Sequence, residues 1–245
     1  MAQNIYDDKS FFDAYSQLKR SVEGLDGAPE WPSIQVLLPD LSGRRVLDLG
    51  CGFGWFCRWA RAHGARSVIG VDLSEKMLGR AKAEAHDDAI TYERSDLENY
   101  TPPGAAFDLV YSSLALHYIE NLAALFNRAF AALVPGGRMV FSVEHPIFTA
   151  PTIPGWSEDA AGHLTWRIDR YLDEGPRTTN WLAPGVIKQH RTIGTYVNLL
   201  LRAGFTISHL EEWAPSVAQI VAHPDWAKER ERPGFLIVAC VGRNT

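Results

Sequence analysis

The sequence predicts an α/β fold built on a doubly wound, mostly parallel sheet of seven strands. Short strand-type runs alternate with amphipathic helical segments through the first 145 residues or so. Several of these runs are apolar through their middles, as strands covered on both faces are. Repeated strand–helix–strand units imply right-handed crossovers with helices on both faces of the sheet. Near the C-terminus two strand-type runs follow each other without a clear crossover helix, which predicts an antiparallel pair at the sheet edge.

The elements follow in order. The five parallel strands are expected at 45–49, 67–72, 90–95, 107–113 and 138–144. Gly64 is placed to end the first helix between them, and Ser74 and Asn121 are placed to cap the next two. A further helix starts near Thr192 and stops at Gly204, and the closing strands are 205–213 and 235–241.

We therefore expect one domain over residues 1–245. It comprises an N-terminal helical cap (1–43), a core (44–144 and 192–245) and a substrate-lid insertion (145–191). In the cap, one helical stripe is formed by Phe11, Tyr15, Leu18 and Val22. In the insertion, the alternation of Leu164, Trp166, Ile168 and Leu172 predicts a half-buried strand, which residues 185–192 would pair with as a long hairpin.

Composition narrows the class of partner. The chain has 245 residues with a formal charge of -5, so it lacks the basic footprint of proteins that bind nucleic acid or anionic membranes. Its three cysteines follow no metal-ligand spacing and suit a reducing compartment. We see no leader pattern and no apolar run near the ~18 residues that cross a bilayer, so we expect a cytoplasmic protein.

A glycine-rich turn follows the first strand, in "VLDLGCGFG" (46–54). Such a turn lets the backbone approach a ligand at a helix N-terminus. Asp72 and Asp96 end the next two strands, where carboxylates reach ribose hydroxyls and an adenine amine, and Asp48 precedes the glycines. Three carboxylates suit a cationic adenosine such as S-adenosylmethionine better than a pyrophosphate. A single acid at a strand end is often only a cap, and Asp108 is expected to be structural.

Six segments, in order and spacing, resemble the signatures of class I S-adenosylmethionine-dependent methyltransferases. They are "VLDLGCGFG", "VIGVDLSEKML", "RSDLEN", "FDLVYSSLALHYIEN", "LVPGGRMVFS" and "RTIGTYVNLLLRAGF". The resemblance implies a Rossmann-like fold and methyl transfer to a small-molecule acceptor. The cofactor-binding residues it implies are Asp48, Gly50, Cys51, Gly52, Gly54, Asp72, Leu73, Met77, Ser95, Asp96, Leu97 and Ser112. Tyr15 and Arg20 are candidates for closing over the cofactor.

The acceptor side is less defined. His117 and His145, each near a predicted strand end, are the candidate general bases, or else ordinary packing residues. No acidic cluster follows the fourth strand, so no metal is expected. The aromatic residues of the insertion line an acceptor pocket or form its core: Phe148, Trp156, Trp166, Tyr171 and Trp181. An NAD-dependent oxidoreductase and a non-catalytic cofactor-binding protein remain the alternatives, and the oligomeric state, monomer or homodimer, stays open.

Overall fold

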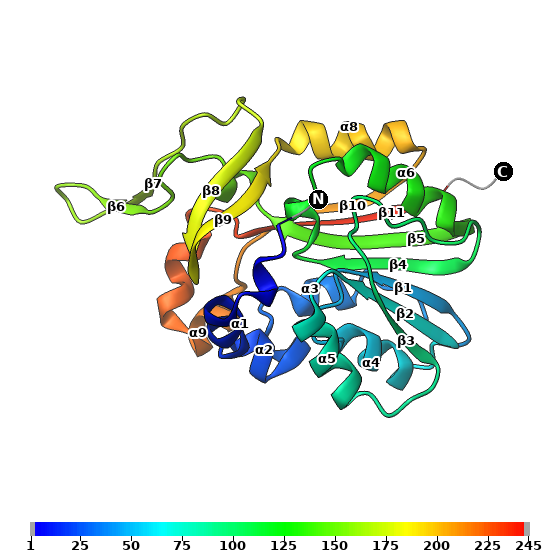
Figure 1. Cartoon of the computed structure of the whole chain (residues 1–245). Coiled ribbons are helices and arrows are strands. Elements are labelled where there is room, and N and C mark those ends of the chain that lie inside the picture. The colour runs from blue at the N-terminus through cyan, green and yellow to red at the C-terminus, as the bar shows by residue number, and fades with distance from the viewer. Residues whose placement is uncertain (1–2, 243–245) are drawn as a thin grey trace.

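The computed structural model describes residues 3–242 and places a seven-stranded sheet at its centre, in the order β10-β11-β5-β4-β1-β2-β3 (Figure 1). The strands are β1 (Arg45–Leu49), β2 (Ser67–Asp72), β3 (Ile90–Arg94), β4 (Phe107–Ser113), β5 (Leu133–Glu144), β10 (Thr206–Trp213) and β11 (Phe235–Val241). β11 runs antiparallel to both β5 and β10, whereas β1 to β5 pair in parallel. The predicted fold is confirmed, including the antiparallel pair at the C-terminal edge.

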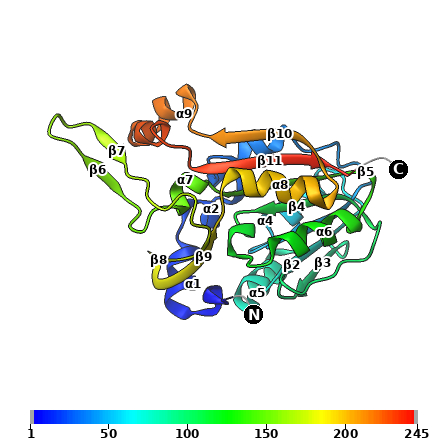
Figure 2. The same ribbon diagram turned by 90° about the horizontal axis from the view of Figure 1, so that it is seen from above.

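Helices cover both faces of this sheet (Figures 1 and 2). One face packs against α6 (Leu122–Ala132) and α8 (Ile193–Ala203), and the other against α3 (Trp31–Gln35), α4 (Trp55–Ala62) and α5 (Glu75–Glu84). Each face therefore has its own apolar core, with the strands buried between them.

The expected helix caps are present. The Ser74 side chain accepts a hydrogen bond from Met77 N, and Asn121 caps α6 in the same way. Gly204 ends α8 in the left-handed conformation, with φ of 105°, which a residue bearing a Cβ adopts only at a cost. The caps fix where each helix begins and hence which side chains meet the sheet.

Two parts of the core differ from the prediction. β5 begins at Leu133, earlier than expected, because the segment through the Pro-Gly-Gly turn still pairs with β4 at Phe107. Two short helices, α9 (Val217–Ala222) and η4 (Pro224–Arg230), separate β10 from β11. They connect antiparallel strands, so they are not a crossover unit.

The predicted hairpin of the insertion is wrong in its pairing. The structure forms two separate hairpins, β6 (Trp156–Glu158) with β7 (Leu164–Trp166), and β8 (Gly175–Trp181) with β9 (Ala183–His190). The alternating pattern does not continue as a half-buried strand, since Leu172 is 84% exposed. A short helix, α7 (Pro146–Thr149), leads into this lid from β5. From here on, "the lid" denotes residues 145–191.

The N-terminal cap is also broken into shorter pieces than one stripe predicts. It consists of η1 (Ile5–Asp7), α1 (Lys9–Ser16), α2 (Lys19–Val22), η2 (Gly24–Gly27) and α3, which packs on the sheet. Because the chain turns between α1 and α2, Phe11 is fully buried whereas Val22 is 58% exposed. The cap lies beside the β8–β9 hairpin, over the end of the sheet that β1 and β4 point toward (Figures 1 and 2).

Candidate functional site

The site lies where the strand order reverses. β1 has β2 on one side and β4 on the other, so the loops after β1 and β4 diverge and leave a crevice at their carboxyl ends. The loop after β1 is the glycine turn, and it leads directly into α4, which begins at Trp55. Sequence order thus brings a helix N-terminus and the ends of two strands to one point.

The three glycines of the turn differ in what lies next to the position of a Cβ atom. A Cβ on Gly50 would overlap Ala115 in the loop after β4, and one on Gly54 would overlap the Tyr92 ring. A Cβ on Gly52 would meet no atom of the described chain within 4 Å. All three have positive φ. Two glycines therefore allow the chain to pack against itself, and only Gly52 leaves its space to something outside the protein.

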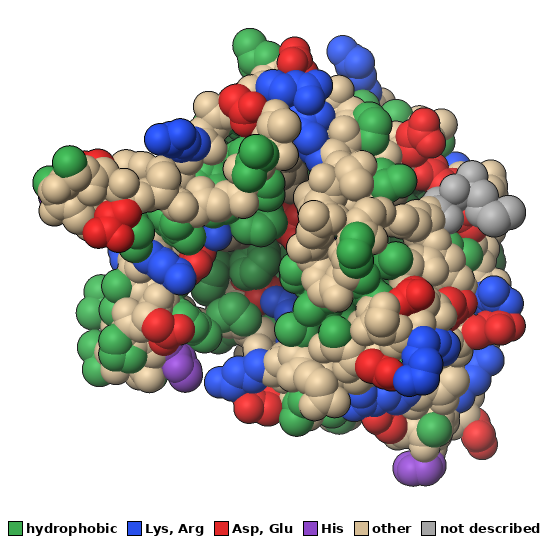
Figure 3. All heavy atoms as spheres, turned by 60° about the vertical axis from the view of Figure 1, so that its left-hand side comes forward, with side chains coloured by type: hydrophobic (Ala, Val, Ile, Leu, Met, Phe, Trp, Pro, Cys, Tyr) green, Lys and Arg blue, Asp and Glu red, His purple; other side chains and the backbone are tan. Residues whose placement is uncertain are grey.

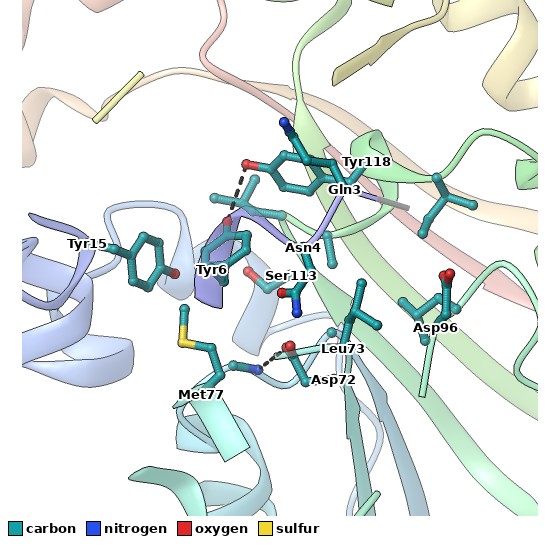
Figure 4. Close-up of a pocket in the computed structure, with 16 residues that line it drawn as sticks. Gln3, Asn4, Tyr6, Tyr15, Asp72, Leu73, Met77, Asp96, Ser113 and Tyr118 are labelled. Carbon is teal, nitrogen blue, oxygen red and sulfur yellow. Dashed lines mark hydrogen bonds between the residues drawn. The ribbon is translucent and has the colours of Figure 1, made fainter. Parts of the chain in front are cut away.

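Gly52 lines a cavity of about 700 Å³ at the carboxyl ends of β1 and β2. We call it the main cavity (Figure 4). It is lined by Gln3, Asn4, Tyr6, Tyr15, Gly50, Gly52, Asp72, Leu73, Met77, Asp96, Leu97, Ser113, Leu114, Ala115, Tyr118 and Ile119. The lining alternates carboxylates and glycines with apolar and tyrosine side chains. Such a surface fits a ligand with both polar and flat apolar portions.

Asp72, at the end of β2, is held rigidly. Its Oδ2 accepts a hydrogen bond from Gly52 N and its Oδ1 one from Ser74 N, each at 2.9 Å. Burial raises the pKa of Asp72 despite these bonds. The carboxylate therefore fixes the glycine turn while it lines the cavity (Figure 4).

A side cavity continues from the main one and shares Tyr15, Gly50, Gly52 and Ser113 with it. It is also lined by Asp48 and Arg20. Asp48 is buried and accepts a hydrogen bond from Cys57 Sγ at 3.3 Å. Burial raises the pKa of this carboxyl to about 7, and the nearby Asp72 adds to the shift. Asp48 is thus set to titrate near neutral pH.

Residues 3–7, which we call the strap, pass over the main cavity. At one end Gln3 Nε2 donates to Gly185 O and its Oε1 accepts from Ile187 N, both on β9 of the lid. At the other end Asp7 accepts bonds from Ser74 Oγ and Lys76 N at the start of α5. Between them the Tyr6 and Tyr118 hydroxyls are 3.2 Å apart (Figure 4). The strap ties the lid, the cavity and α5 together.

Comparison with known proteins identifies the family. A family model described as "Methyltransferase domain" matches residues 46–137. The crystal structure of an S-adenosylmethionine-dependent methyltransferase from Mesorhizobium loti is 59% identical, with a TM-score of 0.87, over 89% of this chain and 100% of that one. The chain belongs to the S-adenosylmethionine-dependent methyltransferase family.

Two relatives of lower identity cover different shares of this chain. An uncharacterized protein of Haemophilus influenzae is 34% identical over 96% of this methyltransferase and 95% of that protein. A malonyl-[acyl-carrier protein] O-methyltransferase of Erwinia billingiae is 38% identical, but only over 41% of this chain and 39% of that one. The second match thus concerns less than half of either chain. The cofactor of the family is S-adenosylmethionine, and both cavities lie at the turn that the family model covers.

Three of the residues expected at the cofactor lie outside both cavities of the methyltransferase. Ser112 is fully buried and donates from Oγ to Leu49 O at 2.7 Å, so it joins β4 to β1. Gly54 accommodates Tyr92, and Ser95 lies past the end of β3. Their cofactor contacts stay predictions. Ser113 lines both cavities instead. The period-two alternation along β4 could have found it, because neighbouring residues of a strand point to opposite faces.

The remaining predicted residues do line the cavities. Gly50, Gly52, Asp72, Leu73, Met77, Asp96 and Leu97 belong to the main cavity, and Asp48 and Cys51 to the side cavity. The residues of the strap, Tyr6 among them, belong to none of the six segments, whereas Tyr118 lies within "FDLVYSSLALHYIEN" but was not expected at the cofactor. Asp108, expected to be structural, accepts hydrogen bonds from the main-chain N and the Nε of Arg45.

Neither candidate histidine is among the described residues that line the main cavity. His117 is buried, and its Nδ1 accepts a hydrogen bond from Glu144 N. Burial, with the charges of Lys188 and Arg191, holds its pKa well below the usual range. His145 is buried with Nε2 3.0 Å from Glu212 Oε1, and burial lowers its pKa to about 4. Both are weak bases at neutral pH, and their catalytic role stays a prediction.

The lid encloses a further cavity, of about 860 Å³, which we call the aromatic cavity. Phe148, Trp156, Trp166 and Trp181 line it, together with Glu144, Lys188, Arg177 and Arg232. Tyr171, the other predicted lining residue, contacts His190 instead. Within residues 3–242 no group of three or more His, Cys, Asp or Glu side chains is arranged to hold a metal ion. None of the helices that the structure describes is long and apolar enough to cross a membrane.

Proposed function

We propose that this methyltransferase transfers the methyl group of S-adenosylmethionine to a small-molecule acceptor bound in the aromatic cavity. The observation that carries the proposal is how little separates the two sites. Trp181 lines the aromatic cavity and packs edge-on against Tyr15, with ring centroids 6.2 Å apart, and Tyr15 lines the main and side cavities. The cofactor site and a cavity suited to an organic molecule therefore adjoin at the Tyr15–Trp181 contact.

We expect each portion of the cofactor to meet lining residues that suit it. Asp96 and Leu97 would meet the adenine, and Asp72 would accept hydrogen bonds from the ribose hydroxyls. The open space at Gly52 would take the portion next to the sulfur. In the side cavity, Asp48 supplies negative charge toward a cationic ligand, and Arg20 lies where a carboxylate would need a cation.

When bound, S-adenosylmethionine supplies a methyl group that its sulfonium already activates. The chain's part is then to align the two reactants and exclude water. The strap would exclude water, because it covers the main cavity and is held by hydrogen bonds at both ends. The acceptor needs a base only if its nucleophile arrives protonated.

Cofactor binding and turnover test this proposal together. Isothermal titration of the protein with S-adenosylmethionine, S-adenosylhomocysteine and NAD should show binding of the first two alone. Asp72→Asn should weaken both by about tenfold to a hundredfold, since a charge-assisted hydrogen bond contributes about 1.5–3 kcal/mol. Asp88→Asn, at an exposed position away from the cavity, is the matched control and should leave both affinities unchanged.

Turnover is measured as S-adenosylhomocysteine released with a panel of small organic acids, phenols and amines. Release that depends on one of these acceptors supports the proposal. Cofactor binding without release on any member of the panel, but with release on a carrier protein or nucleic acid, would exclude a small-molecule acceptor. Binding of NAD in place of S-adenosylmethionine would exclude methyl transfer altogether.

A further inference from the structure

The aromatic cavity opens into an outer cavity of about 920 Å³, and Glu144, Phe148 and Arg232 line both. The walls come from α7, from both lid hairpins and from the segment around η4. Figure 3 shows the resulting hollow between the projecting lid and the body of the molecule, with mainly hydrophobic side chains inside it. Charged groups in such an interior are costly unless each has a partner.

Arg232 is held in this hollow by aromatic rings. Its guanidinium carbon lies 4.2 Å from the ring centroid of Trp166, 4.8 Å from that of Phe148 and 5.2 Å from that of Trp156. The residue is only 7% exposed. Nη2 pairs with Glu229 at 3.0 Å, whereas the buried Nε has no hydrogen-bond partner within the described chain.

Glu144 and Lys188 form a second polar group in the aromatic cavity. The Lys188 side chain is 3% exposed, pairs with Glu144 Oε1 and lies 4.7 Å from the centroid of Trp181. Glu144 Oε2 is buried and, among residues 3–242, has no hydrogen-bond partner. The cavity therefore holds one unmatched donor, on Arg232, and one unmatched acceptor, on Glu144.

Arg177, in the same cavity, is a cation whose donors are all satisfied within the lid. Its Nε, Nη1 and Nη2 donate to four main-chain carbonyls, those of Ala150, Pro176, Arg170 and Asp173. Every branch of that guanidinium is satisfied inside the lid. Leaving a buried polar atom unmatched is unfavourable, and the unmatched atoms of Arg232 and Glu144 belong to residues that line one cavity, which suggests a ligand that completes both.

We propose that the acceptor is a small aromatic acid that also carries a hydroxyl or amine nucleophile. This inference rests on the proposed function. The acidic group accepts from Arg232 Nε, the ring lies among Trp156, Trp166 and Trp181, and the nucleophile donates its proton toward Glu144 Oε2.

The direction of the acceptor follows from where Glu144 lies. Its main-chain N donates to His117, and the adjacent Tyr118 lines the main cavity. Arg232 pairs with Glu229, which lines the outer cavity and not the aromatic one. The nucleophile therefore faces the cofactor and the acid faces outward. In the transfer, the acceptor oxygen or nitrogen bonds to the methyl carbon, the carbon–sulfur bond breaks with its electron pair left on sulfur, and the acceptor proton passes to Glu144.

Ligand series on the unaltered protein test this first. The protein, saturated with S-adenosylhomocysteine, is titrated with 4-hydroxybenzoate, 4-hydroxyphenylacetate and 3-(4-hydroxyphenyl)propanoate, which place the two groups at increasing separation. Their counterparts without the acid are phenol, 4-cresol and 4-ethylphenol, and those without the hydroxyl are benzoate, phenylacetate and 3-phenylpropanoate. At least one hydroxy acid should bind about tenfold tighter than both of its counterparts, since a hydrogen bond to a charged group exceeds 1.4 kcal/mol. If no hydroxy acid exceeds its counterparts, the inference is wrong.

Two variants test which residue binds the acid of the ligand and which binds its hydroxyl. Arg232→Gln should remove the preference for the acid and keep the affinity for the phenol, and Glu144→Gln should remove the preference for the hydroxyl. Arg167→Gln and Glu158→Gln, exposed positions of the same lid, should change neither preference. Retained preferences in Arg232→Gln and Glu144→Gln would overturn the assignment. If a variant does not fold, the series on the unaltered protein decides. Failure of S-adenosylhomocysteine to bind would count against the proposed function instead.

Discussion

The main and side cavities, together called the cofactor cleft from here on, differ from the aromatic cavity in how the chain assembles them. The cleft draws its lining mainly from successive strand ends and the loops after them, from Asp48 to Ile119, and adds only residues of the N-terminal cap. The aromatic cavity combines the end of β5, α7, two lid hairpins and Arg232 beyond η4. The lining of the cofactor cleft therefore comes mostly from one continuous part of the sequence, whereas the lining of the aromatic cavity comes from segments far apart in it.

The difference has a topological cause. In a parallel sheet each strand must end at the same edge, so the residue after each strand reaches the crevice whatever the helices between them contain. Hairpins that project from the sheet have no such constraint, and their mutual position depends on contacts such as the Trp156–Trp166 pair. We therefore expect substitutions in the cleft to affect one defined function and those in the lid to act through packing.

The largest effect is expected from filling the space beside the glycine turn. Gly52→Val adds a branched side chain where the described chain leaves nothing within 4 Å, so S-adenosylmethionine binding should be lost, by more than about a hundredfold. Gly43→Val is the matched control, because Gly43 also has positive φ and an open Cβ position but precedes β1 at the other end of the strand. Titration calorimetry measures the affinity and thermal unfolding measures the strain. Equal losses of affinity in both variants would mean that backbone strain, and not a ligand, accounts for the effect.

Most of the residues that the sequence predicts at the cofactor line the cleft, for the same topological reason. Asp72 and Asp96 could be predicted because one ends a strand and the other lies in the loop just after one, and the glycines because only a few backbone arrangements need them. Prediction failed where a side chain's direction decides the outcome, as at Ser112 and Ser113, which differ by one residue of a strand. The strap was missed because its contacts join residues far apart in sequence, as Gln3 and Gly185 are.

The lid could not be predicted from periodicity. Alternation indicates which residues share a face but not which strand they pair with. The partner of β7 is set by the turn at Asp159, whose carboxylate accepts from the main-chain N of Ala161 and His163. That turn chemistry is present in the sequence, and recognising it would have closed the β6–β7 hairpin at the right place.

A second prediction concerns how the affinity for S-adenosylmethionine depends on pH through the ionisation of Asp48. The pKa of Asp48 is about 7 in the cofactor-free protein, well above the unfolded value of about 3.9. Its contribution to stability is therefore complete below about pH 4 and is lost as the pH rises through 7. A cationic ligand favours the ionised form, so S-adenosylmethionine should bind with release of a proton. Its affinity should then increase by about fivefold between pH 6 and 7 and by about tenfold between pH 6 and 8.

Asp48→Asn provides the comparison, since the amide has the shape of the protonated acid and does not ionise in this range. Calorimetry at pH 6, 7 and 8, in two buffers of different ionisation enthalpy, counts the proton. The variant should show a flat profile and no proton release. A slope that persists in Asp48→Asn would assign the titration to another group of the cleft.

The smallest effect is expected at the strap, which joins the two regions. Asp7 accepts bonds at the first turn of α5, where a negative charge is favoured by the helix dipole by about 0.3–1 kcal/mol. Asp7→Asn keeps the shape and loses the charge, so S-adenosylmethionine should dissociate about twofold to fivefold faster in stopped-flow displacement. Asp8→Asn is the control, because Asp8 caps α1 through Phe11 N and asparagine caps a helix equally well. Unchanged dissociation in Asp7→Asn, or the same acceleration in both variants, would show that the strap does not retain the cofactor. The cleft would then release its ligand independently of the lid to which Gln3 binds.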